Sequence, residues 1–250
     1  MKNPIYIPKG PAAEYADCAL NIFTGCPHKC AYCFAPRVLR KTAEDFANYQ
    51  PRAGLFDAVK KQLSGKGFAG KLIHLCFTCD PFPMGRKDYS NILVLVYLIK
   101  ESGANVQILT KGIVPEDLFA LLNSNDKFGI TLSGAHEMYI KYEPNAAPPI
   151  KRIEQLEKAK AAGIQTFVSC EPVLDEHFIL LAIREFDFID EYRIGKLNYH
   201  PQIEAYLREK GYLTQSWDDF GREAEALCKE RGRNYLIKES LRAEMEKNNG

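Results

Sequence analysis

Short apolar segments that alternate with helical segments are the feature that most limits the folds open to this chain. The helical spacing is clear in Leu55, Val59 and Leu63, which recur every four residues. The predicted strands are residues 18–24, 72–78, 106–110, 128–132, 166–170 and 188–194. Strands that alternate with helices pair in parallel through right-handed crossovers. The pattern therefore predicts an α/β protein built on a parallel sheet.

Six strand–helix units are two short of the eight that close a full TIM-type barrel. The sequence thus predicts a partial (β/α)6 TIM-type barrel with parallel strands, open on one side. After the last strand, helices are predicted at residues 202–210, 217–230 and 238–247. The chain has 250 residues and no long linker. We expect a single domain, with a core of about residues 18–200 and a helical C-terminal extension of about residues 201–250.

Cys26, Cys30 and Cys33 lie close together after the first predicted strand. Thiolates are soft ligands, and three on one short loop can hold one face of a metal cluster. Three ligands to a four-iron cluster leave one iron open for a small molecule. The alternative is a zinc site, which would need a fourth ligand such as His28 or a distant cysteine.

The stretch Cys-Pro-His-Lys-Cys-Ala-Tyr-Cys, residues 26–33, resembles the signature of the radical S-adenosylmethionine (radical SAM) enzymes. In that superfamily three cysteines hold a 4Fe-4S cluster, and the open iron chelates S-adenosylmethionine. The reduced cluster cleaves this cofactor to methionine and a 5′-deoxyadenosyl radical, which abstracts hydrogen from a substrate. The resemblance implies that Cys26, Cys30 and Cys33 are the metal ligands and that Tyr32 lies against the adenine.

Three further motifs narrow this resemblance to the spore photoproduct lyase-like, or DNA repair photolyase-like, branch of the superfamily. They are residues 78–82 (Thr-Cys-Asp-Pro-Phe), residues 109–111 (Leu-Thr-Lys), and Glu143-Pro144 with Arg152. The resemblance covers about residues 18–200. It implies a nucleobase or nucleotide as the favoured substrate class.

The resemblance also implies cofactor-binding roles for residues at strand ends. Lys111 matches a lysine that contacts the carboxylate of S-adenosylmethionine, and Thr131 and Ser133 fall near a position that hydrogen-bonds this cofactor. The alternatives are a solvated lysine and ordinary strand-end polarity. Glu171 ends a strand on the side where parallel barrels carry their chemistry, so we expect it to contact cofactor or substrate. A glutamate before Pro172 could instead begin a turn.

Cys79, Cys170 and Cys76, in this order, are candidate hydrogen donors because they lie near strand ends. A thiol can quench a substrate radical because its S–H bond is weak. The lyases carry their donor cysteine three residues before an aspartate, where this chain has Phe77. The alternative is that all three are packed thiols.

Charge and hydropathy limit the partners of the protein. The chain has 33 Lys and Arg against 32 Asp and Glu, which gives no strong evidence for binding to duplex DNA. It has no run of about 20 apolar residues to span a membrane, and its N-terminus lacks the apolar core of a signal peptide. We therefore expect a cytoplasmic protein, in which eight cysteines favour metal binding or reactive thiols over disulfides.

Together these features predict a radical SAM enzyme that binds a 4Fe-4S cluster and S-adenosylmethionine and acts on an unidentified substrate. Its expected partner is an external one-electron reductant of the flavodoxin or ferredoxin type. The alternative is a non-catalytic iron-sulfur or zinc-binding module for electron transfer or interaction. An electron carrier needs no vacant iron, so the open ligand set argues against that alternative.

Overall fold

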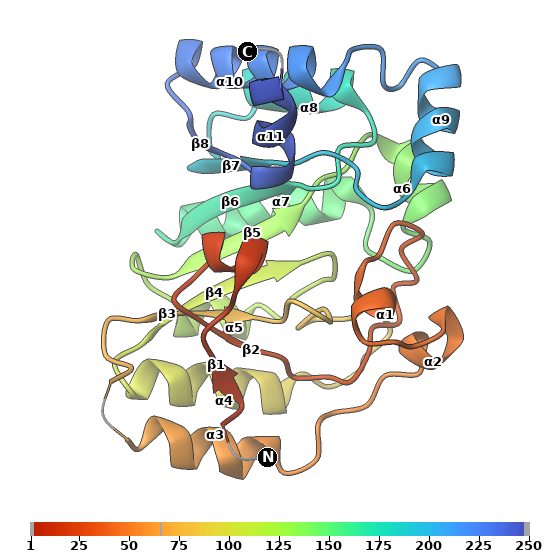
Figure 1. Cartoon of the computed structure of the whole chain (residues 1–250). Helices are drawn as coiled ribbons and strands as arrows, with labels where there is room; N and C mark the ends of the chain where they lie inside the picture. The colour runs from red at the N-terminus through yellow and green to blue at the C-terminus, as the bar shows by residue number, and fades with distance from the viewer. Residues whose placement is uncertain (1–2, 66, 248–250) are drawn as a thin grey trace.

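A single sheet of eight strands forms the centre of the computed structural model, which describes residues 3–65 and 67–247. The strands lie side by side in chain order from β1 to β8 (Figure 1). They are β1 (Ile5–Tyr6), β2 (Cys18–Leu20), β3 (Leu72–Leu75), β4 (Asn105–Thr110), β5 (Lys127–Thr131), β6 (Gln165–Cys170), β7 (Glu191–Ile194) and β8 (Asn234–Ile237). β1 is antiparallel to β2, and each later neighbouring pair is parallel. The sheet is not closed, because β1 and β8 are its two edges.

Helices connect the strands, and several of them cover the outer face of the sheet (Figure 1). The helices are η1 (Gly10–Glu14, a 3-10 helix), α1 (Ala35–Val38), α2 (Ala43–Ala47), α3 (Leu55–Leu63), α4 (Ser90–Glu101), α5 (Asp117–Leu121), α6 (His136–Tyr142), α7 (Pro149–Ala161), α8 (Glu176–Glu185), α9 (Pro201–Glu209), α10 (Trp217–Glu230) and α11 (Glu239–Lys247). None of the helices in the described ranges is both long and apolar enough to cross a membrane.

The predicted partial barrel is confirmed, since all six predicted parallel strands are present as β2 to β7. The three predicted C-terminal helices are present as α9, α10 and α11, and one strand that was not predicted, β8, lies between α10 and α11. Asn234 of β8 pairs with Glu191 of β7, and Ile237 pairs with Ile194. The four residues of β8 are too few to show a clear period in the sequence, and they form a strand because β7 offers an edge to pair with.

The two faces of the sheet differ in chemistry. Outward side chains such as Ile108, Ile130 and Val168 are fully buried beneath the helices, where apolar area removed from water stabilises the fold. Inward side chains on the same sheet include Gln107 and Arg193, which are also buried. The Arg193 guanidinium donates to the side-chain oxygen Oε1 of Gln107 at 2.9 Å. A polar interior of this kind is stable only because its groups are hydrogen-bonded to one another.

The N-terminal segment around η1 crosses the concave face of the sheet (Figure 1). The carbonyl oxygen of Tyr15 accepts a hydrogen bond from Gln107 Nε2 at 2.9 Å, and its hydroxyl donates to Glu171 Oε2 at 3.0 Å. Lys238, just after β8, forms an ion pair with Glu14. These contacts reach β4, β6 and the end of β8, so the segment fastens both halves of the sheet together.

Protonation of His74 should destabilise the fold as the pH falls. His74 is only 1% exposed and its Nδ1 accepts from Gln107 Nε2 at 3.0 Å; burial and the nearby Arg193 lower its pKa to about 3. Histidine in an unfolded chain titrates near about 6.5. Between these two pKa values the unfolded chain binds a proton at His74 that the folded chain does not. The contribution of neutral His74 to the free energy of unfolding is therefore complete above about pH 6.5, and about 2 kcal/mol of it is lost by pH 5.

Urea denaturation of the native protein and of His74→Gln at pH 7 and pH 5 measures this effect. The variant should lose less stability than the native protein between the two pH values. An equal loss in both proteins would show that His74 does not titrate in this way.

Candidate active site

The cysteine loop follows β2 and leads into α1. Cys26, Cys30 and Cys33 are partly buried free thiols on this loop. The amide of Cys26 donates to the carbonyl oxygen of Phe46 at 2.9 Å. Gly25 makes this approach possible, because a Cβ there would lie 2.0 Å from the same oxygen. The loop is therefore held against α2 by a contact that only glycine allows.

The three thiols could hold one face of a four-iron cluster. Within residues 3–65 and 67–247, no three His, Cys, Asp or Glu side chains are arranged to hold one metal ion. A four-iron cluster binds each thiolate at a different iron, so its ligands need not converge on one point. Burial raises the pKa of Cys26 and Cys33, and raises that of Cys30 to about 12. Cationic iron is the kind of partner that would hold such thiols deprotonated.

Glu143 organises a buried hydrogen-bond network behind the cysteine loop. Its Oε1 accepts from the Tyr32 hydroxyl and from Ser133 Oγ at 3.2 Å, while its Oε2 pairs with the Arg152 guanidinium. Burial alone would raise the pKa of Glu143, but the positive charges of Arg152 and Lys111 outweigh it and lower that pKa. The carboxylate therefore stays ionised and fixes the position of the Tyr32 ring.

Arg152 is the cation that this network requires. It is fully buried, and it also donates to the carbonyl oxygens of Ala147 at 2.7 Å and Thr131 at 2.9 Å. Sequence reasoning gave Glu143 and Arg152 no role beyond their part in the resemblance. A glutamate before a proline and an arginine near a helix start are both typical of exposed positions, so only the fold reveals the pair.

Asp80 ties the end of β3 to the end of β4. Its Oδ1 accepts from Thr110 Oγ1 at 2.6 Å, its Oδ2 accepts from the Lys111 amide at 2.8 Å, and His28 Nδ1 lies 3.5 Å from Oδ2. Lys111 Nζ consequently lies 5.5 Å from the centre of the Tyr32 ring. Burial lowers the pKa of Lys111, but the negative charges of Cys30 and Glu143 outweigh it and raise that pKa. Asp80 was not among the predicted site residues, although a carboxylate after a strand was a usable signal.

The structure brings several predicted residues together on this side of the barrel. Tyr32 and Ser133 share the Glu143 carboxylate, and their own hydroxyls lie 3.3 Å apart. Thr131 contributes its carbonyl oxygen to Arg152. The hydroxyl of Thr78 is buried and has no hydrogen-bond partner among the described residues. An unpartnered polar group at a strand end is what a site for a polar cofactor would contain.

Glu171 lies apart from that group, after β6. Its Oε2 accepts from the Tyr15 hydroxyl, which also lies 3.3 Å from Ser169 Oγ. Burial raises the pKa of Glu171, although the Lys238 charge acts in the opposite direction. A Cβ on Gly195 would lie 3.0 Å from Glu171 Cγ and Cδ. Glycine at that position therefore leaves room for the carboxyl group at the strand ends.

The three candidate hydrogen donors fall in two different places. Cys76 is 6% exposed and Cys79 is partly buried, and burial together with the neighbouring Cys79 raises the pKa of the Cys76 thiol. Cys170 is fully buried between the sheet and α10, where the nearby Cys228 contributes to raising its pKa after burial, the main cause. A donor role for Cys170 does not agree with this position, because a sulfur in that layer has no route to a radical inside the barrel.

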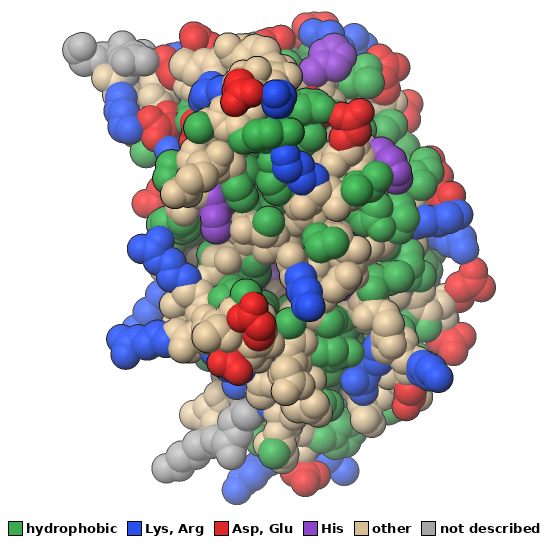
Figure 2. Space-filling view, turned by 90° about the vertical axis from the view of Figure 1, so that its right-hand side faces the viewer, with side chains coloured by type: hydrophobic (Ala, Val, Ile, Leu, Met, Phe, Trp, Pro, Cys, Tyr) green, Lys and Arg blue, Asp and Glu red, His purple; other side chains and the backbone are tan. Residues whose placement is uncertain are grey.

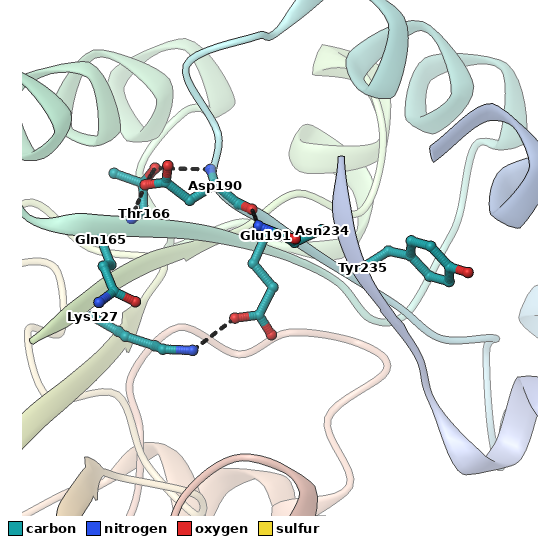
Figure 3. Close-up of a pocket in the computed structure, with 7 residues that line it drawn as sticks. All are labelled: Lys127, Gln165, Thr166, Asp190, Glu191, Asn234 and Tyr235. Carbon is teal, nitrogen blue, oxygen red and sulfur yellow. Dashed lines mark hydrogen bonds and ion pairs between the residues drawn. The ribbon is translucent and has the colours of Figure 1, made fainter. Parts of the chain in front are cut away.

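A separate hollow lies at the opposite, N-terminal ends of β5 to β8 (Figure 3). It is lined by Lys127, Gln165, Thr166, Asp190, Glu191, Asn234 and Tyr235. Lys127 Nζ lies 2.9 Å from Glu191 Oε2, and Asp190 Oδ2 accepts from the Thr166 amide at 2.8 Å. The charged side chains of this hollow thus have partners within it, and no predicted site residue lies there. We therefore assign these residues a structural role.

Comparison with protein families identifies the chain. The profile of the Radical SAM superfamily matches residues 20–180. The chain belongs to the radical SAM superfamily. This radical SAM protein is 25% identical over 185 residues to the uncharacterized protein ORF301 of Acidianus two-tailed virus, covering 67% of this chain and 59% of that one. It is 21% identical over 173 residues to the uncharacterized protein Rv2578c of Mycobacterium tuberculosis, covering 63% and 49%. The chain thus spans about half to three fifths of these relatives.

Solved structures share the fold at low sequence identity. A spore photoproduct lyase mutant with bound AdoMet and dinucleoside spore photoproduct aligns with a TM-score of 0.67 and 12% identity, over 93% of this chain and 80% of that one. Methylornithine synthase aligns with a TM-score of 0.51 and 16% identity, over 88% and 70%. The likeness concerns the fold alone.

Proposed function

We propose that this protein is a radical SAM enzyme that binds a 4Fe-4S cluster and S-adenosylmethionine and abstracts hydrogen from an organic substrate. The supporting observation is the position of three free thiols on one loop, beside Tyr32, Ser133 and Lys111, at the C-terminal ends of parallel strands. When bound, the cluster and cofactor supply the one-electron cleavage chemistry, while the protein supplies binding, orientation and exclusion of water.

In this proposal each residue has a distinct task. Cys26, Cys30 and Cys33 ligate the cluster. Lys111 pairs with the cofactor carboxylate, as a buried ammonium can. Tyr32, whose ring is fixed through Glu143, lies against the adenine, and Ser133 and Thr131 offer hydroxyl groups to the cofactor. The ionised network around Glu143 supports these tasks by holding the binding groups in place before the cofactor arrives.

Replacing Lys111 with alanine should weaken the binding of S-adenosylmethionine by about 1.5–3 kcal/mol, the usual value of a hydrogen bond to a charged group. The backbone amide that holds Asp80 is retained in this variant, so the loop should keep its shape. Isothermal titration calorimetry of the anaerobic, cluster-loaded proteins measures the affinity. As a matched control, Lys127→Ala removes a lysine at the opposite end of the sheet and should leave the affinity unchanged. Equal affinities in all three proteins would refute the role of Lys111.

We further propose a nucleobase or nucleotide as the substrate class. The structurally similar lyase carries a dinucleoside, and Glu171 and the Tyr15 hydroxyl offer polar groups to a base edge on the far side of the barrel mouth. Duplex DNA is not the favoured form, since the chain carries a net charge of only +1 and binding to duplex depends on many neutralised phosphates.

The proposed redox partner is an acidic one-electron carrier of the flavodoxin or ferredoxin type. Between residues 18 and 43 the chain has no Asp or Glu, whereas Lys29, Arg37 and Arg40 are exposed around the cysteine loop. Figure 2 shows the face that carries this loop, with Lys and Arg side chains, and some Asp and Glu side chains, among apolar ones. A basic surface beside the cluster ligands would attract an acidic carrier and speed its association.

A further inference from the structure

Cys76 and Cys79 form a pair of thiols outside the cysteine loop. They are separated by two residues, Phe77 and Thr78, directly after β3. Cys76 is 6% exposed and Cys79 is more accessible, and Cys79 is close enough to act with burial in raising the pKa of the Cys76 thiol. The proposed cluster ligands use neither sulfur, so the pair is free for another chemistry.

The backbone of this pair is unusual. Cys76 has φ of 72°, in the left-handed region that residues with a side chain seldom adopt. Its amide nevertheless donates to the Leu20 carbonyl oxygen at 2.8 Å, and the Thr78 amide donates to Asn21 Oδ1 at 3.0 Å. The hydrogen bonds to Leu20 of β2 and to Asn21, the residue after β2, therefore hold the strained Cys76 in place. Strain of this kind persists where surrounding contacts enforce it, and it is concentrated at functional sites.

We propose that Cys76 and Cys79 are a redox-active dithiol that closes reversibly to an intramolecular disulfide. The oxidant is a small-molecule or protein disulfide. The more accessible Cys79 sulfur, as thiolate, attacks that disulfide and expels one thiolate, which takes up a proton. Cys76 then gives up its proton and attacks the Cys79 sulfur of the mixed disulfide, which releases the second thiol. In sum, two protein S–H bonds and one external S–S bond become one protein S–S bond and two external S–H bonds.

Closure would act directly on the proposed active site. The next residue after the pair is Asp80, which holds the Lys111 amide and the Thr110 hydroxyl. A disulfide would lock the turn before Asp80 and would remove two S–H groups that could quench a radical. The dithiol would then be the competent state and the disulfide the resting state. This inference goes beyond the proposed radical chemistry, and its test does not depend on that chemistry.

The chain offers a direct readout of this disulfide. Trypsin cleavage after Lys71 and Arg86 yields a peptide, residues 72–86, that contains both cysteines of the pair and no others. The anaerobic, cluster-loaded protein is equilibrated in dithiothreitol buffers of rising oxidised fraction and then alkylated with N-ethylmaleimide. After digestion with trypsin, the peptide masses are measured by mass spectrometry. We expect the peptide to change from doubly alkylated to unalkylated, with a mass lower by two hydrogen atoms than that of the free dithiol.

Two variants separate a pair from independent thiols. In Cys79→Ser the remaining Cys76 should stay alkylatable across the same buffers, whereas Cys18→Ser should leave the transition of peptide 72–86 unchanged. Double alkylation of the native peptide at every buffer composition would overturn the proposal. The proposal would also be overturned if Cys76 in Cys79→Ser still lost its alkylation as the oxidised fraction rises. That result would show that the Cys76 sulfur is oxidised without Cys79.

Discussion

Replacing Cys30 with alanine should reduce the iron content of the reconstituted protein from about four atoms per chain to nearly none. Cys30 is the middle one of the three proposed ligands, and its carbonyl oxygen accepts from the Cys33 amide at 3.1 Å, so the loop should keep its backbone without the thiol. Two remaining thiolates leave two irons without a protein ligand. Iron assay and the visible absorbance after anaerobic reconstitution measure the loss.

Cys18→Ala is the matched control for this prediction. Cys18 is also a buried free thiol, at the start of β2, but it lies at the opposite end of that strand from the loop. Its removal should leave the iron content unchanged. Zinc retained in stoichiometric amount by the native protein, with no uptake of iron, would contradict the cluster assignment.

Replacing Arg152 with alanine should destabilise the fold by about 3–5 kcal/mol, because it leaves an ionised carboxylate buried without its cation. Glu143 is only 2% exposed, and its carboxylate forms an ion pair with Arg152. The same change frees the carbonyl oxygens of Ala147 and Thr131. Urea denaturation followed by circular dichroism measures the free energy of unfolding.

Lys158→Ala provides the comparison on the same helix. Lys158 pairs with Glu116 at 2.8 Å, but both side chains are well exposed, at 57% and 82%, and exposed pairs contribute little. We expect no resolvable loss of stability in this variant. If Arg152→Ala were as stable as Lys158→Ala, the Glu143 network would not have the role we assign to it.

Elements that carry their own signal could be predicted from the sequence. Residues 128–132 and 166–170 are apolar enough to read as strands alone, and both are buried strands in the structure. β8, with the sequence Asn-Tyr-Leu-Ile, could not be predicted, since its side chains are mostly half-buried or exposed. These residues form a strand because they pair with β7, and the order of residues in the sequence does not indicate that pairing.

In the candidate site, too, features made by neighbouring residues could be predicted, and contacts between distant residues could not. The cysteine motif could be read directly because its members lie within eight residues of sequence, at 26–33. The contact of Tyr32 with Glu143 spans 111 positions, and that of Tyr15 with Glu171 spans 156. Such pairs arise only when the barrel brings distant strand ends together, so neither Glu143 nor Tyr15 could be assigned in advance.

Release of 5′-deoxyadenosine is the most direct test of the central claim. The anaerobic protein with its cluster reduced by dithionite is incubated with S-adenosylmethionine, and the products are separated by liquid chromatography and mass spectrometry. We predict 5′-deoxyadenosine from the native protein and from Cys18→Ala, and none from Cys30→Ala. A native protein that holds a reduced four-iron cluster and binds the cofactor, yet releases no more 5′-deoxyadenosine than Cys30→Ala, would contradict the account.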